Sequence, residues 1–599
     1  MSAEVIANNA SVGSLSESFL DRALKIYVAG AADPVFDPEQ ARDALAYAQR
    51  TLEKGARVLL RLFATPASFN AGLRRVCEGA VSRAVGSALP SNACRWHRCG
   101  EVETCRSPNL TIQVCFIVPE RRQREAGCRA DVLFVRQLGD AVRLRGFMHP
   151  GTRVRVTGEA PKLEGSEAQL QVFTKAGERE YTPNFTSKIS STPVAGSLVA
   201  CGAGAVKDVL VVGAGMAGAF AAHSLKLRGF RLSVVDAGAV PASGASALYA
   251  ALAHPHWEAV DTSGFRLTAA GTMRLAELLE AHPECVHASG LLDLAIDEEE
   301  ERHFRQAALS VAKVGAKGGH HPYVPEFLEA DAASRTAGTR VRFGGWWYAE
   351  GRLVNAGALV RTLLKGIASP VLTNMPVRLR REEGVWLAFN RAGVVVAKAQ
   401  AVVAAAGLAS GALFGDEADD YGISPLYGRI SILRSCDCRT LAAPVTGRGY
   451  AARTADGYVG VGATYERACE PVLSVQEAHA HNLAILPRLF EGADACVPCG
   501  FYEGVRAVAA DRMPIAGPMV DMPALRALDA NRTEAAQVPL LPQAWGLFAL
   551  GSRGLSWGLM LAEVLAARMA GEPAPIVHSL EESLSPARHA LRRRRTKTR

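Results

Sequence analysis

Three glycines at fixed spacing and a later aspartate are the residues of this sequence that most clearly indicate chemistry. Gly213, Gly215 and Gly218 form the pattern GxGxxG directly after the apolar run 209–212, and Asp236 ends a second apolar run. The first glycine allows a tight turn, the second lets the backbone approach a pyrophosphate, and the third lets a helix pack closely on a strand. A carboxylate at the end of the second strand can accept hydrogen bonds from ribose hydroxyls. The pattern therefore predicts a dinucleotide-binding βαβ unit.

A segment of small residues follows this unit along the chain. Ser243, Ala245 and Ser246 lie within the stretch Ala-Ser-Gly-Ala-Ser, just after the strand that ends in the aspartate. Such a turn would let backbone lie against a flavin and its phosphates. A flexible surface loop is the alternative interpretation of the same residues.

Length and composition indicate a long globular chain with several structural units around these residues. The chain has 599 residues, enough for about three or four structural units. With 49% hydrophobic and 21% charged residues, the composition excludes a wholly disordered or fibrous protein. Apolar strands alternate with helical segments within residues 24–77 and again from residue 208 onwards, which predicts parallel α/β sheets. The Ser-, Gly- and Ala-rich stretch 186–204 is a predicted linker.

Charge and cysteine content narrow the cellular context and the partners. The net charge of +8 permits a polyanionic partner, and arginines crowd the last twelve residues, 588–599. This basic tail is either a solvated terminus or a phosphate contact with RNA. The N-terminus lacks the pattern of a secretory signal, and the longest apolar stretch is broken by glycines, so no membrane association is expected. The 13 scattered cysteines fit a reducing cytoplasm, and their clusters lack the paired spacing of a metal site.

Three further motifs carry a resemblance to a known family. They are Gly-Val-Arg at 504–506 with Asp-Arg-Met-Pro-Ile-Ala-Gly at 511–517, Phe-Ala-Leu-Gly-Ser-Arg-Gly-Leu at 548–555, and Gly-Tyr-Val-Gly-Val-Gly-Ala-Thr-Tyr-Glu at 457–466. Together with the glycine pattern, they resemble FAD-dependent amine oxidoreductases of the glycine oxidase and D-amino-acid oxidase superfamily. More closely, they resemble the C-terminal half of the bifunctional tRNA 5-methylaminomethyl-2-thiouridine biosynthesis (MnmC) family. The likeness covers about residues 205–590.

The resemblance implies an α/β fold: a Rossmann-like FAD-binding domain with an interleaved α+β substrate domain, preceded by a partial α/β methyltransferase-like region at 1–200. It implies FAD-binding parts at about 205–290, 345–420 and 500–580, and substrate parts at about 291–344 and 421–499. It also implies a set of FAD contacts beyond the glycine turn and its aspartate: Ser243, Ala245, Ser246, Gly407, Gly551, Ser552, Gly554 and Leu555.

In the MnmC family the flavin half oxidises the carboxymethylaminomethyl group on the wobble uridine of certain tRNAs, leaving an aminomethyl group. The resemblance therefore implies FAD as cofactor and tRNA as partner. Such a site must hold a carboxylate, for which the bidentate fork of arginine is suited. Arg506 and Arg553, inside the matching motifs, are the candidates, and structural ion pairing is the alternative role of each. A small-molecule oxidase of glycine-like or sarcosine-like amines and an inactive RNA-binding remnant are the competing functions.

The chain also departs from the family pattern. In MnmC proteins the other half is an S-adenosylmethionine-dependent methyltransferase, but no GxGxG turn precedes residue 200 here, so methylation and S-adenosylmethionine binding by the N-terminal region are weak expectations. After Ser246, where the family tends to have glycines, this chain has Ala-Leu-Tyr-Ala-Ala. Gly428 is followed by Arg429 where the family ordinarily has a Gly–Gln pair. These changes bear on the geometry around the flavin and leave the predicted fold unchanged.

Overall fold

The computed structural model describes most of the chain after residue 205 and, before it, nine strands and a few helical residues. The described part comprises 206–597 without 256–261, 317–324, 368, 417, 436–440, 492–495, 530–532, 534–536, 571–573 and 577. The nine N-terminal strands form one sheet in the order β3-β4-β5-β2-β1-β6-β7-β9-β8, whose five central strands are parallel. The bounds of the five central strands are Leu110–Cys115 (β5), Val58–Phe63 (β2), Leu24–Val28 (β1), Val132–Val135 (β6) and Arg153–Val156 (β7). The last helical segment of the alternation predicted within 24–77 lies outside the described residues.

A five-stranded sheet in the order β11-β10-β19-β27-β26 organises one of two halves of the structure after residue 205, with strands drawn from both ends of this part of the chain. Its first four strands are parallel and β26 is antiparallel. The bounds are Arg231–Val235 (β11), Asp208–Val212 (β10), Ala401–Ala404 (β19), Leu540–Phe548 (β27) and Ile515–Val520 (β26). The central strands consist of apolar residues because helices or a smaller sheet cover both faces.

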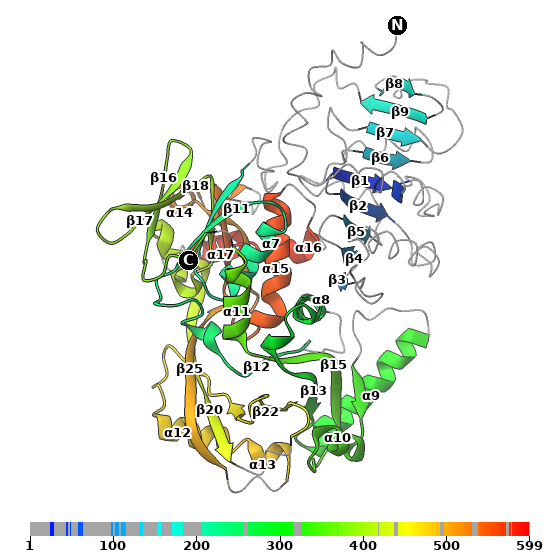
Figure 1. The fold of residues 1–599 in the computed structure, drawn as a ribbon, viewed down its shortest axis with the longest axis vertical. Helices are drawn as coiled ribbons and strands as arrows, with labels where there is room; N and C mark the ends of the chain where they lie inside the picture. The colour runs from blue at the N-terminus through cyan, green and yellow to red at the C-terminus, as the bar shows by residue number, and fades with distance from the viewer. Residues whose placement is uncertain are drawn as a thin grey trace.

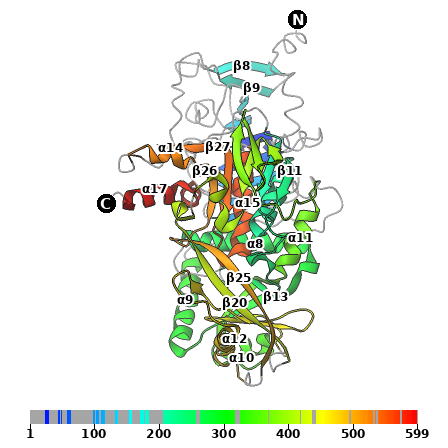
Figure 2. The same cartoon turned by 90° about the vertical axis from the view of Figure 1, so that its left-hand side faces the viewer.

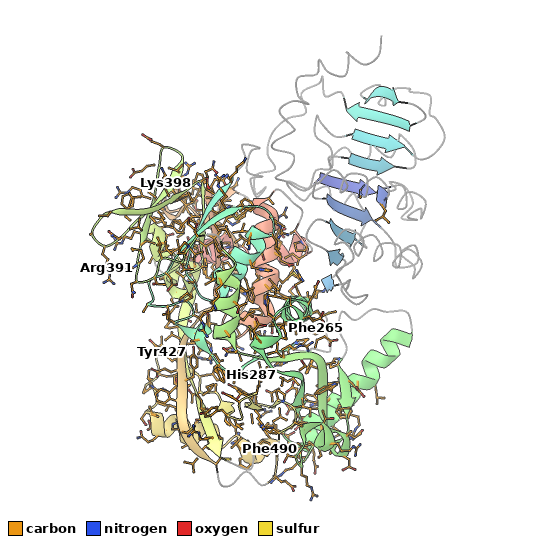
Figure 3. All side chains as sticks on the ribbon, viewed as in Figure 1. Phe265, His287, Arg391, Lys398, Tyr427 and Phe490 are labelled. Atoms are coloured by element: carbon orange, nitrogen blue, oxygen red, sulfur yellow. The ribbon has the colours of Figure 1, made fainter. Side chains whose placement is uncertain are left out.

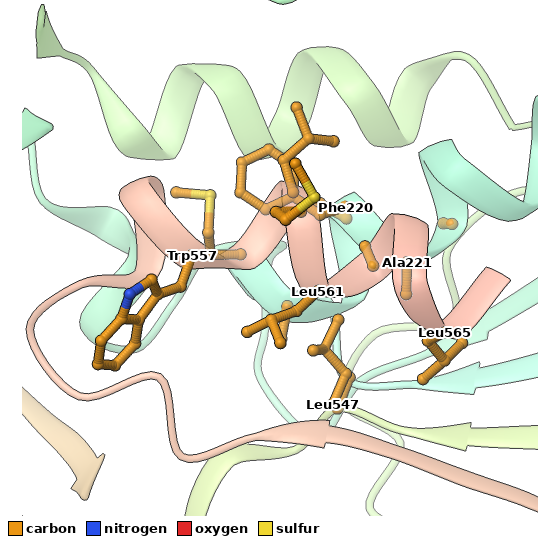
Figure 4. Packing of buried hydrophobic residues seen from close by; sticks show 14 of the residues in the cluster. Phe220, Ala221, Leu547, Trp557, Leu561 and Leu565 are labelled. Atoms are coloured by element: carbon orange, nitrogen blue, oxygen red, sulfur yellow. The ribbon is translucent and has the colours of Figure 1, made fainter. Parts of the chain in front are cut away.

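Four helices lie on one face of this sheet and share its larger core cluster: α7 (Met216–Lys226), α8 (Ser263–Glu280), α11 (Ala356–Lys365) and α15 (Gly554–Met569). Helix α15 is buried on all sides, which its apolar sequence requires. Figure 4 shows side chains of α7, α15 and β27 gathered between the helices and the sheet, among them Phe220, Leu561 and Leu547.

The other face of the five-stranded sheet is covered by a three-stranded antiparallel sheet and by the C-terminal helix. The strands are β16 (Arg378–Glu382), β17 (Val385–Phe389) and β18 (Val395–Ala399), and the helix is α17 (Ala587–Lys597). Both contribute residues to a second core cluster, Trp386 from β17 and Leu591 from α17. We call the two sheets with their helices the five-stranded half. Figure 2 shows α17 and α14 (Met522–Arg526) projecting on one side of this half.

A ten-stranded sheet organises the other half, here called the ten-stranded half (Figure 1). Its strands are β12 (Ala251–Ala253), β15 (Gly345–Val354), β13 (Val286–Leu294), β21 (Val445–Thr446), β22 (Tyr450–Arg453), β23 (Val459–Gly462), β20 (Ile423–Ser435) and β24 (Glu466–Arg467), with β14 (Glu326–Leu328) paired to β15 and β25 (Val497–Ala509) paired to β20. The helices α9 (Glu298–Ala316), α10 (Ala330–Ala337), α12 (Val475–Leu483) and α13 (Leu486–Leu489) pack on it.

The long antiparallel pair of β20 and β25 brings the two halves together. Its register runs from Ile423 opposite Ala509 to Ser435 opposite Val497, so residues 86 to 62 positions apart in sequence become neighbours. The domain division given by the sequence stays a prediction. In the structure β15 and β25, which that division groups with the FAD-binding parts, are strands of the ten-stranded sheet. No helix among the described residues is long and apolar enough to span a membrane.

Candidate functional site

The predicted glycine turn lies where β10 ends and α7 begins. Gly213 has φ +115°, and a Cβ atom there would lie 2.3 Å from the carbonyl oxygen of Ala405. A Cβ atom on Gly218 would lie 1.8 Å from the carbonyl oxygen of Gly213, so both positions require glycine. Gly215 is the N-cap of α7 and makes no side-chain cap. The positive end of this helix is therefore suited to an anionic group.

Asp236 follows β11 and holds the backbone of the turn. Its Oδ2 accepts a hydrogen bond from the Ala214 N–H at 2.6 Å, and its Oδ1 accepts one from the Gly238 N–H at 2.7 Å. The sequence did not predict that Asp236 stabilises the turn by these hydrogen bonds. The predicted contact of Asp236 with a ribose stays a prediction, at the edge of the sheet where such ligands bind.

The segment of small residues after Asp236 is packed between the two halves. A Cβ atom at Gly238 would collide with Ser243 Oγ at 2.0 Å, and Ser246 Oγ accepts a hydrogen bond from the Met216 N–H, the first amide of α7, at 2.9 Å. Ala245 begins a short 3₁₀ turn, Ala245–Ala247, which lies against β25. Hydrogen bonds thus hold this segment as a wall beside the glycine turn, with Ser243, Gly244 and Ala245 exposed, and its contact with a flavin stays a prediction.

The remaining predicted FAD contacts lie at the ends of the neighbouring parallel strands. Gly407 follows β19 with φ +59°, and no heavy atom lies within 4 Å of the Cβ position there. Gly551 follows β27 with φ +54°, and its N–H donates to the Ala507 carbonyl of β25 at 3.0 Å. A Cβ atom at Gly554, where α15 begins, would lie 3.9 Å from Met216 of α7. The C-terminal motif is therefore adjacent to the glycine turn, with Ser552 exposed and Leu555 buried beside it.

Arg506 projects from β25 on the side that faces this wall. The odd-numbered residues from Val497 to Val505 are exposed, whereas Tyr502 and Gly504 on the opposite side contact the 243–247 segment. Tyr502 Oη donates to the Gly244 carbonyl at 2.7 Å. Burial raises the pKa of Tyr502 to about 12, and the nearby Arg506 lowers it in part. The even-numbered side of β25 therefore carries Arg506 towards the glycine turn.

The Arg506 guanidinium is stacked and has no carboxylate beside it. Its Cζ lies 4.8 Å from the ring centroid of Tyr465, and a Cβ atom at Gly428 would lie 2.6 Å from its Nη1. Nη1 is buried without a hydrogen-bond partner, and among the described residues none forms an ion pair with Arg506. Burial raises the pKa of Tyr450, and the positive charge of nearby Arg506 partly lowers it. An unpaired guanidinium with two tyrosines near it can receive an anion.

Arg553, the second predicted substrate cation, sits at the N-cap of α15. Its Cζ lies 5.2 Å from the ring centroid of Trp557, whose side chain is 3% exposed. The structure therefore places Arg553 beside Gly551 and Gly554 and stacks it on a core tryptophan. Its contact with substrate stays a prediction.

Two departures from the family pattern have structural partners. Arg429 Nε donates to Glu503 Oε2 at 2.8 Å across the β20–β25 pair, and Arg429 N–H donates to Thr464 Oγ1 at 2.9 Å. Arg429 is therefore committed to the sheet, and Gly428 beside it keeps the space that Arg506 occupies.

Tyr249, in the Ala-Leu-Tyr-Ala-Ala stretch, is held on two sides. Its Oη donates to Asp456 Oδ2 at 2.9 Å, and its carbonyl bonds His287 Nε2 at 3.0 Å. His287 Nδ1 accepts the Ala455 N–H at 3.3 Å, so its Nε2 is the protonated nitrogen, and burial lowers the pKa of this imidazole. Hydrogen bonds thus replace the glycines in fixing this segment.

Sequence reasoning missed Tyr450, Tyr465 and Tyr502 as neighbours of the predicted arginine. Tyr465 lies inside a quoted motif, but its stacking depends on strand pairing across about 40 residues. Tyr450 shows no local motif at all. The even spacing of Tyr502 and Arg506 is the signal that could have assigned them to the same side, once 497–509 is recognised as one strand.

Residues 208–568 match the family described as FAD dependent oxidoreductase, and this range covers more than half of the chain. The chain belongs to the FAD-dependent oxidoreductase family. The chain is therefore an FAD-dependent oxidoreductase, related to amino-acid oxidases that act on CH–NH groups.

Two relatives are similar in sequence to this FAD-dependent oxidoreductase. It is similar to the tRNA 5-methylaminomethyl-2-thiouridine biosynthesis bifunctional protein MnmC of Paraburkholderia xenovorans, at 32% identity over 64% of the chain and 60% of the relative. The corresponding protein of Cupriavidus necator is 31% identical over 65% of the chain and 61% of the relative. The match thus spans about three fifths of the length of these relatives.

Solved structures show the same fold. Glycine oxidase from Bacillus cereus superposes with a TM-score of 0.51 at 19% identity, covering 63% of this chain and 98% of that one. Iminodiacetate oxidase from a Chelativorans species gives a TM-score of 0.50 at 22% identity, with the same coverage of both chains. The described part after residue 205 therefore has the α/β fold of this family with mixed sheets.

The residues present fit an FAD. Glycines 213, 407 and 551 follow three adjacent parallel strands with positive φ. The Cβ position at Gly407 is open, and a Cβ atom at Gly551 would make only an ordinary contact with Val508 at 3.7 Å. Gly215 begins α7 without a side-chain cap. These features leave backbone rather than large side chains at the ends of the three strands, as a dinucleotide with a flavin requires.

Proposed function

We propose that this enzyme removes the carboxymethyl group oxidatively from 5-carboxymethylaminomethyl(-2-thio)uridine at the wobble position of tRNA. The substrate amine, FAD and one water would yield 5-aminomethyl(-2-thio)uridine, glyoxylate and reduced FAD. The proposal combines the family match with the similarity to MnmC proteins, and it extends the activity named for those relatives to this chain.

Arg506 is the observation that carries the proposal. The substrate differs from most amines by its carboxylate, and Arg506 is a cation that lacks a carboxylate partner among the described residues. It lies on the side of β25 that contacts the 243–247 segment, beside the expected flavin site. A bidentate pair with this guanidinium would hold the carboxylate and so fix the adjacent methylene.

Each residue of the site has a defined task in this proposal. Arg506 binds the carboxylate, and the Tyr465 ring keeps the guanidinium plane in place by stacking. Gly428 leaves room for the guanidinium, while Gly551 and Gly554 keep side chains away from the flavin. When bound, FAD supplies the two-electron oxidation of the C–H bond next to the amine nitrogen. Arg553 stays a second candidate for the carboxylate or for the leaving part of the substrate.

The N-terminal region enters only as a weaker proposal. Methylation of the product amine with S-adenosylmethionine would require a cofactor turn, and residues 1–200 show no GxGxG pattern. We therefore assign the flavin reaction to residues 205–590 and leave methylation to the test below.

The test is mass spectrometry of wobble nucleosides after incubation of the protein with tRNA that carries 5-carboxymethylaminomethyluridine, with and without S-adenosylmethionine. Conversion to the aminomethyl nucleoside, absent with Arg506→Met, is the expected result. A further methyl gain would establish the N-terminal activity. Conversion of glycine or sarcosine, with no change in the tRNA, would instead establish a small-molecule amine oxidase.

A further inference from the structure

The three-stranded sheet β16–β18 has one face buried and one exposed. Leu379, Trp386 and Ala388 belong to the core cluster beneath it. The register places Arg378 opposite Phe389 and Arg380 opposite Leu387, on the face away from this core. Figure 1 shows these strands standing out from the edge of the five-stranded half. Within the described chain nothing covers this outer face, and four of the five residues of β16 are exposed.

The outer face combines cations with a half-buried aromatic centre. Arg380 and Lys398 both lie opposite Leu387, one on each neighbouring strand, so two cations flank an apolar residue in one row. The Arg380 Cζ lies 5.2 Å from the ring centroid of Phe389 in the next row. Arg391 lies at the tip of the β17–β18 turn, and Figure 3 shows Arg391 and Lys398 at the outer rim of this sheet.

The charge balance of this small sheet is strongly positive. Residues 378–399 contain five arginines and lysines but only two carboxylates, Glu382 and Glu383. The pair of Arg380 with Glu382, at 3.4 Å, is exposed and therefore weak. No ion pair involves Arg378, Arg391 or Lys398 among the residues that the structure describes.

The rest of the molecule reinforces this polarity. Helix α17, with exposed Arg592 and Arg593, packs into the same core cluster as the small sheet and hence on the same side of the five-stranded sheet. The first turn of α9, in the ten-stranded half, carries four consecutive glutamates, Glu298–Glu301. A polyanion would be attracted to the first region and repelled from the second.

We propose that the outer face of β16–β18 is a docking surface for the RNA substrate, on which Arg378, Arg380 and Lys398 contact phosphates and an unpaired base stacks on Phe389. The proposal rests on the proposed function. Open sheets with a central aromatic residue and flanking cations suit single-stranded RNA, because stacking and phosphate contacts require no base pairing. The expected flavin site then lies at the ends of β10, β19 and β27 of the same half, with Arg506 beside it on β25, and the small sheet holds a distal part of the tRNA.

The test compares two double variants with equal change in net charge. Arg380→Glu with Lys398→Glu removes the row on the outer face. Arg302→Glu with Arg340→Glu changes two exposed arginines of the ten-stranded half and serves as the matched control. The measurement is fluorescence anisotropy of a fluorescein-labelled tRNA transcript over a series of salt concentrations, with melting temperature and bound FAD confirming the fold of each variant.

We expect the first variant to bind tRNA at least ~10-fold more weakly and to show a shallower salt dependence, by about one to two counterions. The control should bind within ~2-fold of the parent protein at the same salt. Equal affinities of the two variants would overturn the proposal. So would binding of phosphatidylserine vesicles that depends on Arg380 and Lys398 while tRNA binding does not.

A second readout separates this surface from the proposed function. The free nucleoside 5-carboxymethylaminomethyluridine is too small to reach the outer face, so its turnover should be unchanged in the Arg380→Glu, Lys398→Glu variant, whereas turnover of the tRNA falls. If the parent protein converts neither substrate, the proposed function fails. The anisotropy result then still decides whether the small sheet binds RNA.

Discussion

Charged side chains are treated differently in the two halves of the molecule. In the five-stranded half Arg274 of α8 pairs with Glu563 of α15 at 2.7 Å, and both are nearly inaccessible, at 8% and 2% exposure. In the ten-stranded half two partly buried groups, Arg506 and Asp293, have no ion-pair partner among the described residues. Paired charges fasten one half internally, whereas the unpaired guanidinium of the other half is available to a ligand.

The lack of an ion-pair partner has different consequences for the two groups. Burial, with the nearby Glu300 adding to it, raises the pKa of Asp293 to about 7, so this carboxyl can become neutral by holding a proton. Arginine cannot lose its proton at any ordinary pH. Arg506 therefore remains a cation that only an external anion can complete, which is why this comparison points to a substrate carboxylate.

The largest effect is expected from replacing the unpaired arginine of the ten-stranded half. Arg506→Met should lower kcat/KM for the carboxylate-bearing amine by about 10³-fold, equivalent to ~4 kcal/mol, because the charge-assisted pair is lost. Its melting temperature should not fall, since Arg506 has no ion-pair partner to lose among the described residues. Arg506→Lys should recover part of the activity. Unchanged kinetics in Arg506→Met would transfer the role to Arg553.

The second test removes the buried ion pair of the five-stranded half. Glu563→Gln should lower the free energy of unfolding by about 3 kcal/mol, because it leaves Arg274 buried with only Glu277. Chemical denaturation gives this value. Glu491→Gln, which removes the exposed pair with Arg340, is the control and should change stability by less than about 1 kcal/mol. Equal effects of the two variants would contradict the distinction between the halves.

The raised pKa of Asp293 predicts that its effect on stability depends on pH. Since its pKa is raised in the folded protein, ionisation costs stability, and this cost is absent below about pH 4, grows as the pH rises towards 7 and is complete above it. Asp293→Asn should therefore stabilise the protein at pH 8, by about 2 kcal/mol, and have little effect at pH 4. A pH-independent effect in thermal unfolding would show that Asp293 is not the titrating group.

The smallest effect concerns the C-terminal helix. Asp511 pairs with Arg588 at 2.9 Å and with His589 at 3.2 Å, and these groups hold its pKa below the usual range. A lowered pKa means that the stabilisation is present at pH values above about 4 and is lost as the pH falls further. Asp511→Asn should cost about 1 kcal/mol at pH 7 and nothing at strongly acidic pH. A cost that persists in acid would assign the effect to packing.

Arg588 also shows where sequence reasoning stopped short. The arginines of 588–599 were interpreted together as one basic tail, open to RNA or solvent. In the structure residues 587–597 form α17, and Arg588 donates to the carbonyls of Met513 and Pro514 besides its pair with Asp511. Both partners lie about 75 positions earlier in the chain. No property of the tail itself separates this half-buried arginine from exposed Arg592 and Arg593.

The sequence by itself determined the dinucleotide-binding unit and the family. The residues of the turn are close together in the chain, and their requirements, such as the positive φ of Gly213, are local. Tertiary structure alone decided which arginine is free to bind. The pairing of β20 with β25 commits Arg429 to Glu503 and leaves Arg506 stacked on Tyr465 without a carboxylate. Whether a charged side chain has an ion-pair partner depends on neighbours that long-range strand pairing brings together. Residue types and their spacing along the chain do not reveal these neighbours.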